Sequence, residues 1–185
     1  MIKNILISIK NFFLADFEYY KIFSASASVK DGSLFQNSDF SFSSVVDESL
    51  IKNNRHTEIK NNHASINHES RCYGVFKNDE LVASCYVWSG GFYNRVRGFL
   101  PLAPNEAELT FLVVVKELRG AGIAAKLIDF ARAEEGKLGT SKIYARVWHS
   151  NISSERSFIK AGWIKDFSAI SFRLRPLAKK FVFKC

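Results

Sequence analysis

The sequence predicts an α/β fold, and three consecutive segments in its second half carry that prediction. Residues 113–115 form an apolar, β-branched run that is typical of a buried strand. After a turn with two glycines, residues 123–135 place apolar side chains on one helical face, and Gly136 and Gly139 are expected to end this helix. Residues 142–148 then indicate a second strand. A strand, a helix and a strand in this order favour parallel pairing within one sheet.

The first third of the chain predicts smaller elements. Residues 1–15 carry an apolar stripe at helical spacing, so we expect a helix that packs on its own domain. Residues 17–24 predict the first strand, whereas the serine-rich stretch after them favours no element. Ser43 or Ser44 is expected to cap a short helix that ends near residue 53. The polar residues up to 70 then predict a surface loop.

A hairpin and a late strand complete the expected sheet. Residues 73–77 and 81–88 predict a β-hairpin, because three polar residues separate two apolar runs. Residues 89–105 are expected to form a loop rich in aromatic and arginine side chains. Residues 170–174 predict a late strand, which residues 181–183 would extend.

The composition limits the classes of protein that the chain can belong to. Its 185 residues suffice for one domain with a hydrophobic core. Three cysteines without a C-x-x-C pair argue against a disulfide framework and favour a reducing compartment, which we take as the cytoplasm. His56, His63 and His68 match no compact metal motif, so we expect no metal site. No stretch approaches the roughly 20 apolar residues that span a bilayer.

The net charge of +8 is placed unevenly along the chain. From Arg156 onward, eight lysine or arginine residues stand against a single acid, Asp166. Such a segment attracts polyanions, although it is equally compatible with a solvated basic face. No nucleic-acid recognition motif is present, so we expect no nucleic acid partner. The basic amphipathic stripe at the start of the chain leaves peripheral membrane contact open, and the sequence leaves homodimer formation open too.

The glycine turn predicts a phosphate-binding site. Gly120 and Gly122 let successive backbone N–H groups converge without Cβ clashes, and the helix start adds unpaired donors and a positive dipole end. A P-loop is excluded because Lys126 stands at the wrong spacing and no serine or threonine follows it. A dinucleotide fingerprint over Gly120, Gly122 and Ala125 lacks the acid expected after the second strand.

Two motifs in this region resemble the GCN5-related N-acetyltransferase (GNAT) family. Residues 119–124, Arg-Gly-Ala-Gly-Ile-Ala, match the acyl-CoA pyrophosphate motif [RQ]-x-x-G-x-[GA]. Residues 151–163 resemble the block N-x-x-[SA]-x-x-x-[YF]-x-x-x-G-[FW]. Glu108 lies near the start of the central strand, where the family often has an acid. The resemblance covers roughly residues 72–176.

This resemblance implies a fold and a division of the chain. The fold is a mixed, mostly antiparallel central sheet that is flanked by helices and splayed at its middle strands. We expect a single acyl-CoA N-acyltransferase domain over residues 1–185. Within it, residues 1–70 would form amino-terminal helices and a strand, residues 72–176 the core with the CoA site, and residues 177–185 a basic tail.

The resemblance also implies a reaction, in which an acetyl group passes from acetyl-CoA to a primary amine without a metal. The backbone N–H of Leu112 would stabilise the oxyanion, and Glu108 would act as the base, with Glu106 as a second candidate. Glu108 could instead only orient the strand or pair with an arginine. The residues expected to bind acetyl-CoA are Val113, Val114, Arg119, Gly120, Ala121, Gly122, Ile123, Ala124, Asn151 and Phe158.

One position departs from the family pattern and puts the acid step in doubt. Phe158 stands seven residues after Asn151, where many members have a tyrosine, and a phenyl ring cannot donate a proton to the leaving thiolate. Ser154, Tyr144 and water remain as proton sources, and we take Ser154 as the candidate. Because of this departure, a non-catalytic, acyl-CoA-binding regulatory module stays an alternative.

The acceptor is expected to be a small-molecule amine that binds against residues 89–105. Stacking faces and cations in this stretch favour a phosphorylated or nucleotide-linked amine, such as an amino sugar of a surface polysaccharide. A peptide or protein amino terminus is the alternative acceptor. The residues expected to contact the acceptor are Trp88, Phe92, Tyr93, Arg95 and Arg97.

Overall fold

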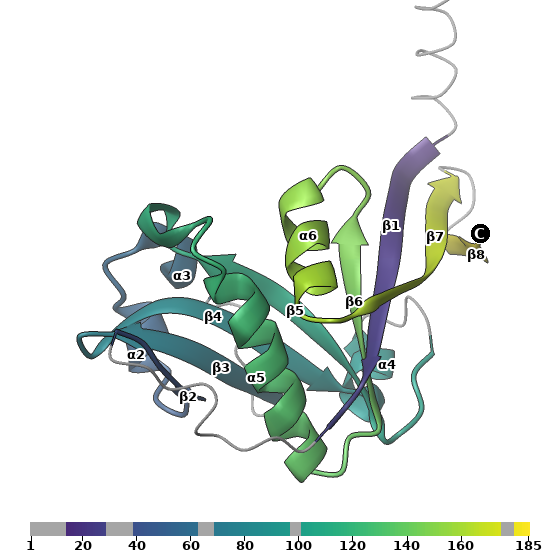
Figure 1. Ribbon diagram of the computed structural model, residues 1–185. Coiled ribbons are helices and arrows are strands. Elements are labelled where there is room, and N and C mark those ends of the chain that lie inside the picture. The colour runs from purple at the N-terminus through teal and green to yellow at the C-terminus, as the bar shows by residue number, and fades with distance from the viewer. Residues whose placement is uncertain (1–13, 29–38, 63–68, 97–100, 175–179) are drawn as a thin grey trace, which may run out of the picture.

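The computed structural model describes residues 14–28, 39–62, 69–96, 101–174 and 180–185 (Figure 1). The helix predicted over residues 1–15 lies outside these residues, apart from its last two positions, which begin a strand. No helix in the described part of the chain is long and apolar enough to cross a membrane.

A single mixed sheet organises the described residues, with the strand order β2-β3-β4-β5-β6-β1-β7-β8. Neighbouring strands are antiparallel except β5 and β6, which are parallel as predicted. The mostly antiparallel α/β fold is therefore confirmed. The strands are β1 Leu14–Ser26, β2 Ser41–Ser44, β3 Ser70–Lys77, β4 Glu80–Ser89, β5 Glu106–Val114, β6 Lys142–Trp148, β7 Ile164–Leu174 and β8 Lys180–Lys184.

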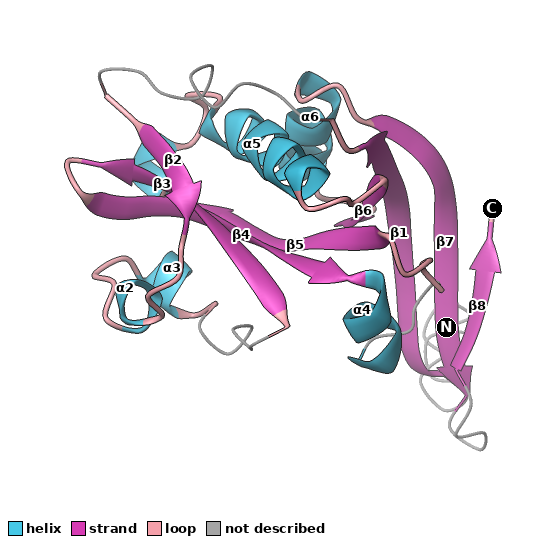
Figure 2. Ribbon diagram, turned by 90° about the horizontal axis from the view of Figure 1, so that it is seen from below, coloured by secondary structure: helices cyan, strands magenta, loops and turns pink. Residues whose placement is uncertain are grey.

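Helices cover both faces of this sheet. Figure 2 shows α5 and α6 on one face and α2, α3 and α4 on the other. A short 3₁₀ helix links β5 to the glycine turn. The helices are α2 Ser49–Lys52, α3 Thr57–Lys60, α4 Gly90–Val96, α5 Ile123–Lys137 and α6 Ile152–Lys160, and the 3₁₀ helix is η3 Lys116–Leu118.

The two parallel strands separate halfway along, as the resemblance implies. β5 pairs with β6 only from Glu106 to Leu109. Phe111 then takes a positive φ of 50°, and the register against β4 shifts nearby, so that the rest of β5 follows β4 alone. Figure 1 shows the resulting gap between the two ribbons, on the side of α5 and α6.

β1 occupies a central place in the sheet, between β6 and β7. Tyr20 pairs with Trp148 on one side and with Ala169 on the other, both antiparallel. Ile22 and Phe23 are buried in the core. The strand predicted over residues 17–24 is thus confirmed, but it is longer than expected.

The β3–β4 hairpin is confirmed and has the backbone that a tight turn requires. Asn78 and Asp79 have φ values of 50° and 62°. Two consecutive left-handed residues match the right-handed twist of the flanking strands, and Asn and Asp tolerate this conformation better than most residues.

The structure corrects the elements predicted around this hairpin. Ser43 and Ser44 belong to β2, and the following helix begins only at Ser49, whose N–H donates to Oδ1 of Asp47. The polar loop contains α3, and the loop predicted over residues 89–105 begins with α4. Short helices of this kind carry too few residues for a helical pattern to be visible.

Two further predictions are wrong in detail. Gly136 lies inside α5 rather than at its end. A β-carbon there would lie 2.9 Å from the backbone carbon of Ser28, so glycine at this position permits the close approach of that segment. Residues 181–183 do not extend the late strand but belong to β8, which pairs antiparallel with β7. The segment predicted as a basic tail therefore includes the edge strand of the sheet.

A buried carboxylate fixes the far end of α5. Glu135 is fully buried and accepts two hydrogen bonds from Arg71, of 2.5 and 2.6 Å. The hydroxyls of Tyr73 and Thr140 donate to it over 2.7 and 2.9 Å. These contacts attach α5 to β3 and hold the helix whose other end begins at the glycine turn.

We expect Glu135→Ala to lower the free energy of unfolding by about 3 kcal/mol, because it leaves the guanidinium of Arg71 and two hydroxyls without their common acceptor. Urea denaturation monitored by circular dichroism measures this loss. Glu134→Ala is the matched control: Glu134 pairs with Lys137 on the surface of the same helix, so its loss should cost under about 1 kcal/mol. Equal losses in both variants would contradict the structural role of Glu135.

Candidate functional site

A cavity of about 700 Å³ lies beside the splayed end of β5. Its walls are the end of β5, the turn before α5, and α6, so the two sequence motifs meet in it. The predicted site residues that line it are Leu112, Val113, Val114, Arg119, Gly120, Gly122, Ile123, Ala124, Asn151 and Ser154. Their individual roles stay predictions.

The turn at the start of α5 has the backbone conformation that glycine permits. Gly120 and Gly122 have φ values of 85° and 78°, which most other residues adopt only with strain. Gly122 is the N-cap of α5 and no side chain caps this helix. The first-turn N–H groups of α5 therefore lie at the cavity wall, together with the positive end of the helix dipole.

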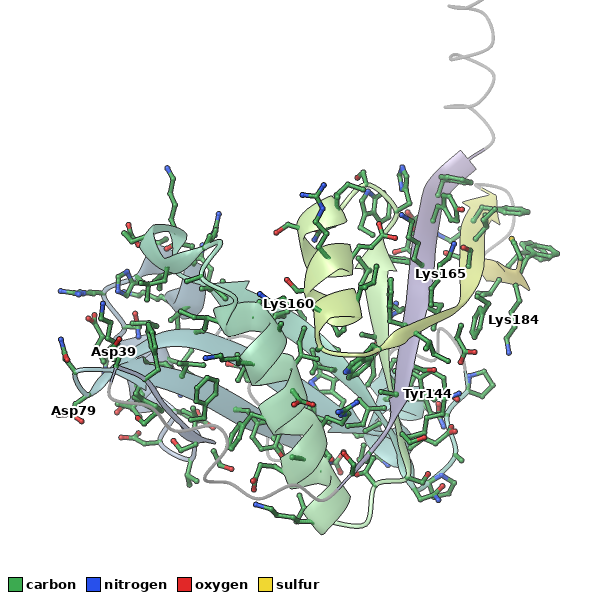
Figure 3. All side chains as sticks on the ribbon, in the orientation of Figure 1. Asp39, Asp79, Tyr144, Lys160, Lys165 and Lys184 are labelled. Atoms are coloured by element: carbon green, nitrogen blue, oxygen red, sulfur yellow. The ribbon has the colours of Figure 1, made fainter. Side chains whose placement is uncertain are left out.

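α6 adds a cap and two cations to the opposite wall. The side chain of Asn151 accepts a 3.1 Å hydrogen bond from the N–H of Ser154, so it caps α6. Arg156 and Lys160 lie one helical turn apart and both line the cavity. Lys160, labelled in Figure 3, reaches the glycine turn: a β-carbon added at Gly122 would lie 3.1 Å from its Nζ.

The cavity is electropositive. Arg119, Arg156 and Lys160 line it, and no acidic side chain is among the described residues that line it, although Glu58 lies 3.8 Å from Arg119. Arg119 also ties the turn to the strand, since its Nε donates to the carbonyl of Val114 over 3.1 Å. From the sequence, Arg156 and Lys160 were recognised only as part of a basic segment. Their i, i+4 spacing on the helix after Asn151 is the signal that could have identified them as residues of this cavity.

A second, smaller cavity of about 60 Å³ has Tyr93 of α4 in its wall and so lies on the α4 side of the sheet. Glu108 lines it and is only 3% exposed. Nε of Arg146 donates to Oε1 of Glu108 over 2.6 Å. The Arg146 guanidinium also lies 5.4 and 5.9 Å from the ring centres of Tyr20 and Tyr93. Glu108 therefore forms an ion pair with an arginine, which was the alternative to its predicted role as the base.

Arg146 is a permanent cation at this position. Burial lowers its pKa, but the charge of Glu108, supported by Tyr93 and by the hydrogen bond to Glu108, raises the pKa above its ordinary value overall. Arg146 thus keeps its charge beside Glu108, and the role of Glu108 as the base stays a prediction.

The predicted acceptor residues are divided between different places. Tyr93 lines the cavity beside Glu108. Trp88 is buried and packs against Phe92 with ring centres 5.2 Å apart. Phe92 and Arg95 line a separate depression, where Arg95 pairs with Glu69. Because α4 turns these side chains to different sides, the structure does not bring Arg95 to Glu108. Arg97 lies outside the described residues.

The candidate proton donors lie on opposite sides of the sheet. Ser154 lines the larger cavity, whereas Tyr144 lines the smaller one and donates to Glu106 over 3.2 Å. Burial raises the pKa of Tyr144, and the charge of Glu106 adds to this effect. A hydrogen bond with Lys142 opposes it but does not cancel it.

Phe158 lies in the core and not at the cavity wall. It is 3% exposed, and its ring centre lies 5.7 Å from that of Phe23 and 5.0 Å from that of Trp163. It therefore fixes α6 on the sheet, and the structure does not bring it to the predicted CoA site. Ala121 is exposed within the turn but does not line the cavity either.

Metal ligands are not clustered in the described chain, where no three His, Cys, Asp or Glu side chains could hold one ion. Cys72 and Cys85 are buried free thiols, and burial raises the pKa of Cys72 to about 12. Such thiols are inert at neutral pH.

Several solved structures with the same fold are described as GNAT acetyltransferases. An acetyltransferase of the GNAT family from Novosphingobium aromaticivorans is 19% identical with a TM-score of 0.58, over 86% of this chain and 65% of that one. A GNAT acetyltransferase from Colwellia psychrerythraea is 13% identical with a TM-score of 0.59, over 92% of this chain and 61% of that one. At these identities the likeness shows the fold alone.

A third structure is the GCN5-related glucosamine N-acetyltransferase region of a fungal multi-domain β-N-acetylglucosaminidase. It is 12% identical with a TM-score of 0.59, over 99% of this chain and 22% of that one. The chain thus spans less than two thirds of the length of these structures. Comparison with curated protein sequences gives no match.

The family model described as the acetyltransferase (GNAT) family matches residues 36–163. This range is more than half of the chain and contains the splayed strand, the glycine turn and all of α6. The chain belongs to the GNAT acetyltransferase family.

Proposed function

We propose that this chain transfers the acetyl group of acetyl-CoA to a primary amine. The observation that carries the proposal is the electropositive cavity in which the glycine turn, the free end of β5 and α6 meet. The backbone donors at the start of α5, with Arg156 and Lys160, suit a pyrophosphate. The backbone of Val113 and Val114, which β6 does not pair, suits the amide groups of pantetheine.

The two cavities suggest how the reaction is divided. Acetyl-CoA would lie on the α5 and α6 side, and the amine would enter on the α4 side, where Glu108 lies. Glu108 would take a proton from the ammonium, directly or through water, and the amine would attack the thioester carbonyl carbon. The N–H of Leu112 would stabilise the charge on the carbonyl oxygen. The thiolate that leaves takes a proton from Ser154 or from water, and the second proton that the acylated nitrogen loses replaces it on that donor.

The acceptor that we propose is an anionic amine, such as a nucleotide-linked amino sugar of a surface polysaccharide. The excess of basic residues after Arg156 supports an anionic ligand. A structure of the same fold carries the description of a glucosamine N-acetyltransferase, which supports an amino sugar. We place the reaction in a reducing compartment such as the cytoplasm, a proposal supported by the free thiols of Cys72, Cys85 and Cys185.

One observation favours a second function, that of an acyl-CoA-binding regulator without turnover. Phe158 replaces the family's frequent tyrosine and is committed to the core, so this position supplies no acid.

The test of both functions combines calorimetry of acetyl-CoA binding with release of free CoA thiol across a panel of amines. Binding with amine-dependent release supports the enzyme, binding without release on any amine supports the regulator, and absence of binding contradicts both.

A further inference from the structure

The cavity beside Glu108 has a cation at its outer side. Lys184 of β8 lines this cavity together with Glu108 and Arg146, and Lys184 is exposed whereas Glu108 is buried. Figure 3 labels Lys184 and, on β6, Tyr144, which lines the same cavity. The cavity therefore leads from a buried carboxylate to an exposed ammonium group.

Backbone pairing fixes Lys184 in this place. Lys184 pairs with Ala169 of β7, and the next residue, Cys185, exchanges two hydrogen bonds of 3.0 and 2.8 Å with Ser168. Since side chains alternate along a strand, this register turns Lys184 to the α4 side of the sheet.

The charge of Lys184 differs from the other charges nearby because no carboxylate pairs with it. Arg146 pairs with Glu108, and Lys142 pairs with Asp166 over 3.0 Å. Lys184 forms no ion pair within the described residues; its Nζ lies 4.9 Å from the centre of the Phe167 ring. A hydrogen bond from Lys142 lowers the pKa of Asp166, and the charge of Lys184 adds to that effect from further away.

The size of the cavity restricts what can enter it. A volume of about 60 Å³ corresponds to roughly two water molecules. The amine end of an acceptor fits beside Glu108, and the cavity is open towards solvent rather than enclosed. The remainder of the acceptor must therefore lie at the exposed side, next to Lys184.

We infer that Lys184 is a specificity-determining residue that binds an anionic group of the acceptor, so that the enzyme selects amines with a carboxylate or phosphate close to the reacting nitrogen. This inference rests on the proposed function. The anionic group would then bind Lys184 on the last strand of the sheet and not Arg95, whose charge already pairs with Glu69.

Matched pairs of amines test the inference: phenethylamine against phenylalanine, and ethanolamine against phosphoethanolamine. The variant is Lys184→Met, which keeps the length and the apolar stem, and Lys184→Arg restores the charge. Lys165→Met on β7 is the control, because Lys165 is exposed (Figure 3) and is not among the residues that line the Glu108 cavity.

We expect the wild type to prefer at least one charged member over its neutral partner. Lys184→Met should raise KM for that substrate by about tenfold, the order of one charge-assisted hydrogen bond. It should leave the neutral partner unchanged, Lys184→Arg should recover most of the loss, and Lys165→Met should change neither.

Three results would overturn the inference: acetylation of neither member of any pair, no preference for charge in the wild type, or an equal loss on both members in Lys184→Met. Acetyl-CoA affinity, measured on each sample by calorimetry, separates these outcomes from failure of the proposed function. If acetyl-CoA binds normally and an amine is acetylated, only the role of Lys184 is rejected; if acetyl-CoA does not bind, or binds without acetylation of any amine, the proposed function falls first.

Discussion

Gly122→Asp is expected to abolish acetyl-CoA binding, with an affinity loss of more than about 100-fold. The new carboxylate would lie at the positive end of α5, where the pyrophosphate is proposed to bind, and would repel it. Its β-carbon would also lie 3.1 Å from Nζ of Lys160, so the carboxylate would pair with that cation and remove it from the ligand. Isothermal titration calorimetry with acetyl-CoA measures the effect.

Gly122→Asn is the matched control for this variant. Asparagine has the shape of aspartate and tolerates the φ of 78°, but it carries no charge. Its affinity should therefore fall much less than that of Gly122→Asp. Equal losses in the two variants would assign the effect to strain rather than charge, and unchanged affinity in Gly122→Asp would remove the glycine turn from the ligand site.

Glu108→Gln should lower kcat by roughly 100-fold or more, the range expected when a general base is lost. Glutamine keeps the shape of the side chain and a hydrogen-bond acceptor for Arg146, but it cannot take up a proton. The affinity for acetyl-CoA should hardly change, because Glu108 lines the cavity on the other side of the sheet. Measuring kcat across pH on the same preparation that binds acetyl-CoA checks both points.

Glu106→Gln provides the control on the same strand. Glu106 accepts hydrogen bonds from Tyr144 and from the N–H of Ala103, and it is not among the residues that line the Glu108 cavity. Its loss should therefore change kcat by a few-fold at most. The opposite result, a large loss in Glu106→Gln with wild-type turnover in Glu108→Gln, would assign the base to Glu106.

The local part of this structure could be predicted from the sequence. The strand before the glycine turn, α5 and β6 follow from apolar periodicity within short windows, and the β3–β4 hairpin follows from three polar residues between two apolar runs. The phosphate cradle is local too, because two glycines and a helix start are enough to specify it. Two motifs separated by a helix and a strand were sufficient to identify the family.

The contacts that define the two cavities depend on distant parts of the chain. Arg146 meets Glu108 only because β5 and β6 are parallel neighbours, and alternation along β6 does not reveal which acid it will face. Phe158 is large and apolar, as a residue in the wall of the CoA site could be. It packs against Phe23 of β1 instead and so belongs to the core. Neither pairing is encoded at a fixed sequence spacing.

The sequence by itself determined the family, the α/β elements and the glycine turn, because each depends on residues near one another in the chain. Only the tertiary structure placed β1 between β6 and β7, where Tyr20 pairs with Trp148, and β8 at the sheet edge, where Lys184 reaches the Glu108 cavity. Strand order is decided by burying the apolar faces of all strands at once, and that depends on the whole chain rather than on any local pattern.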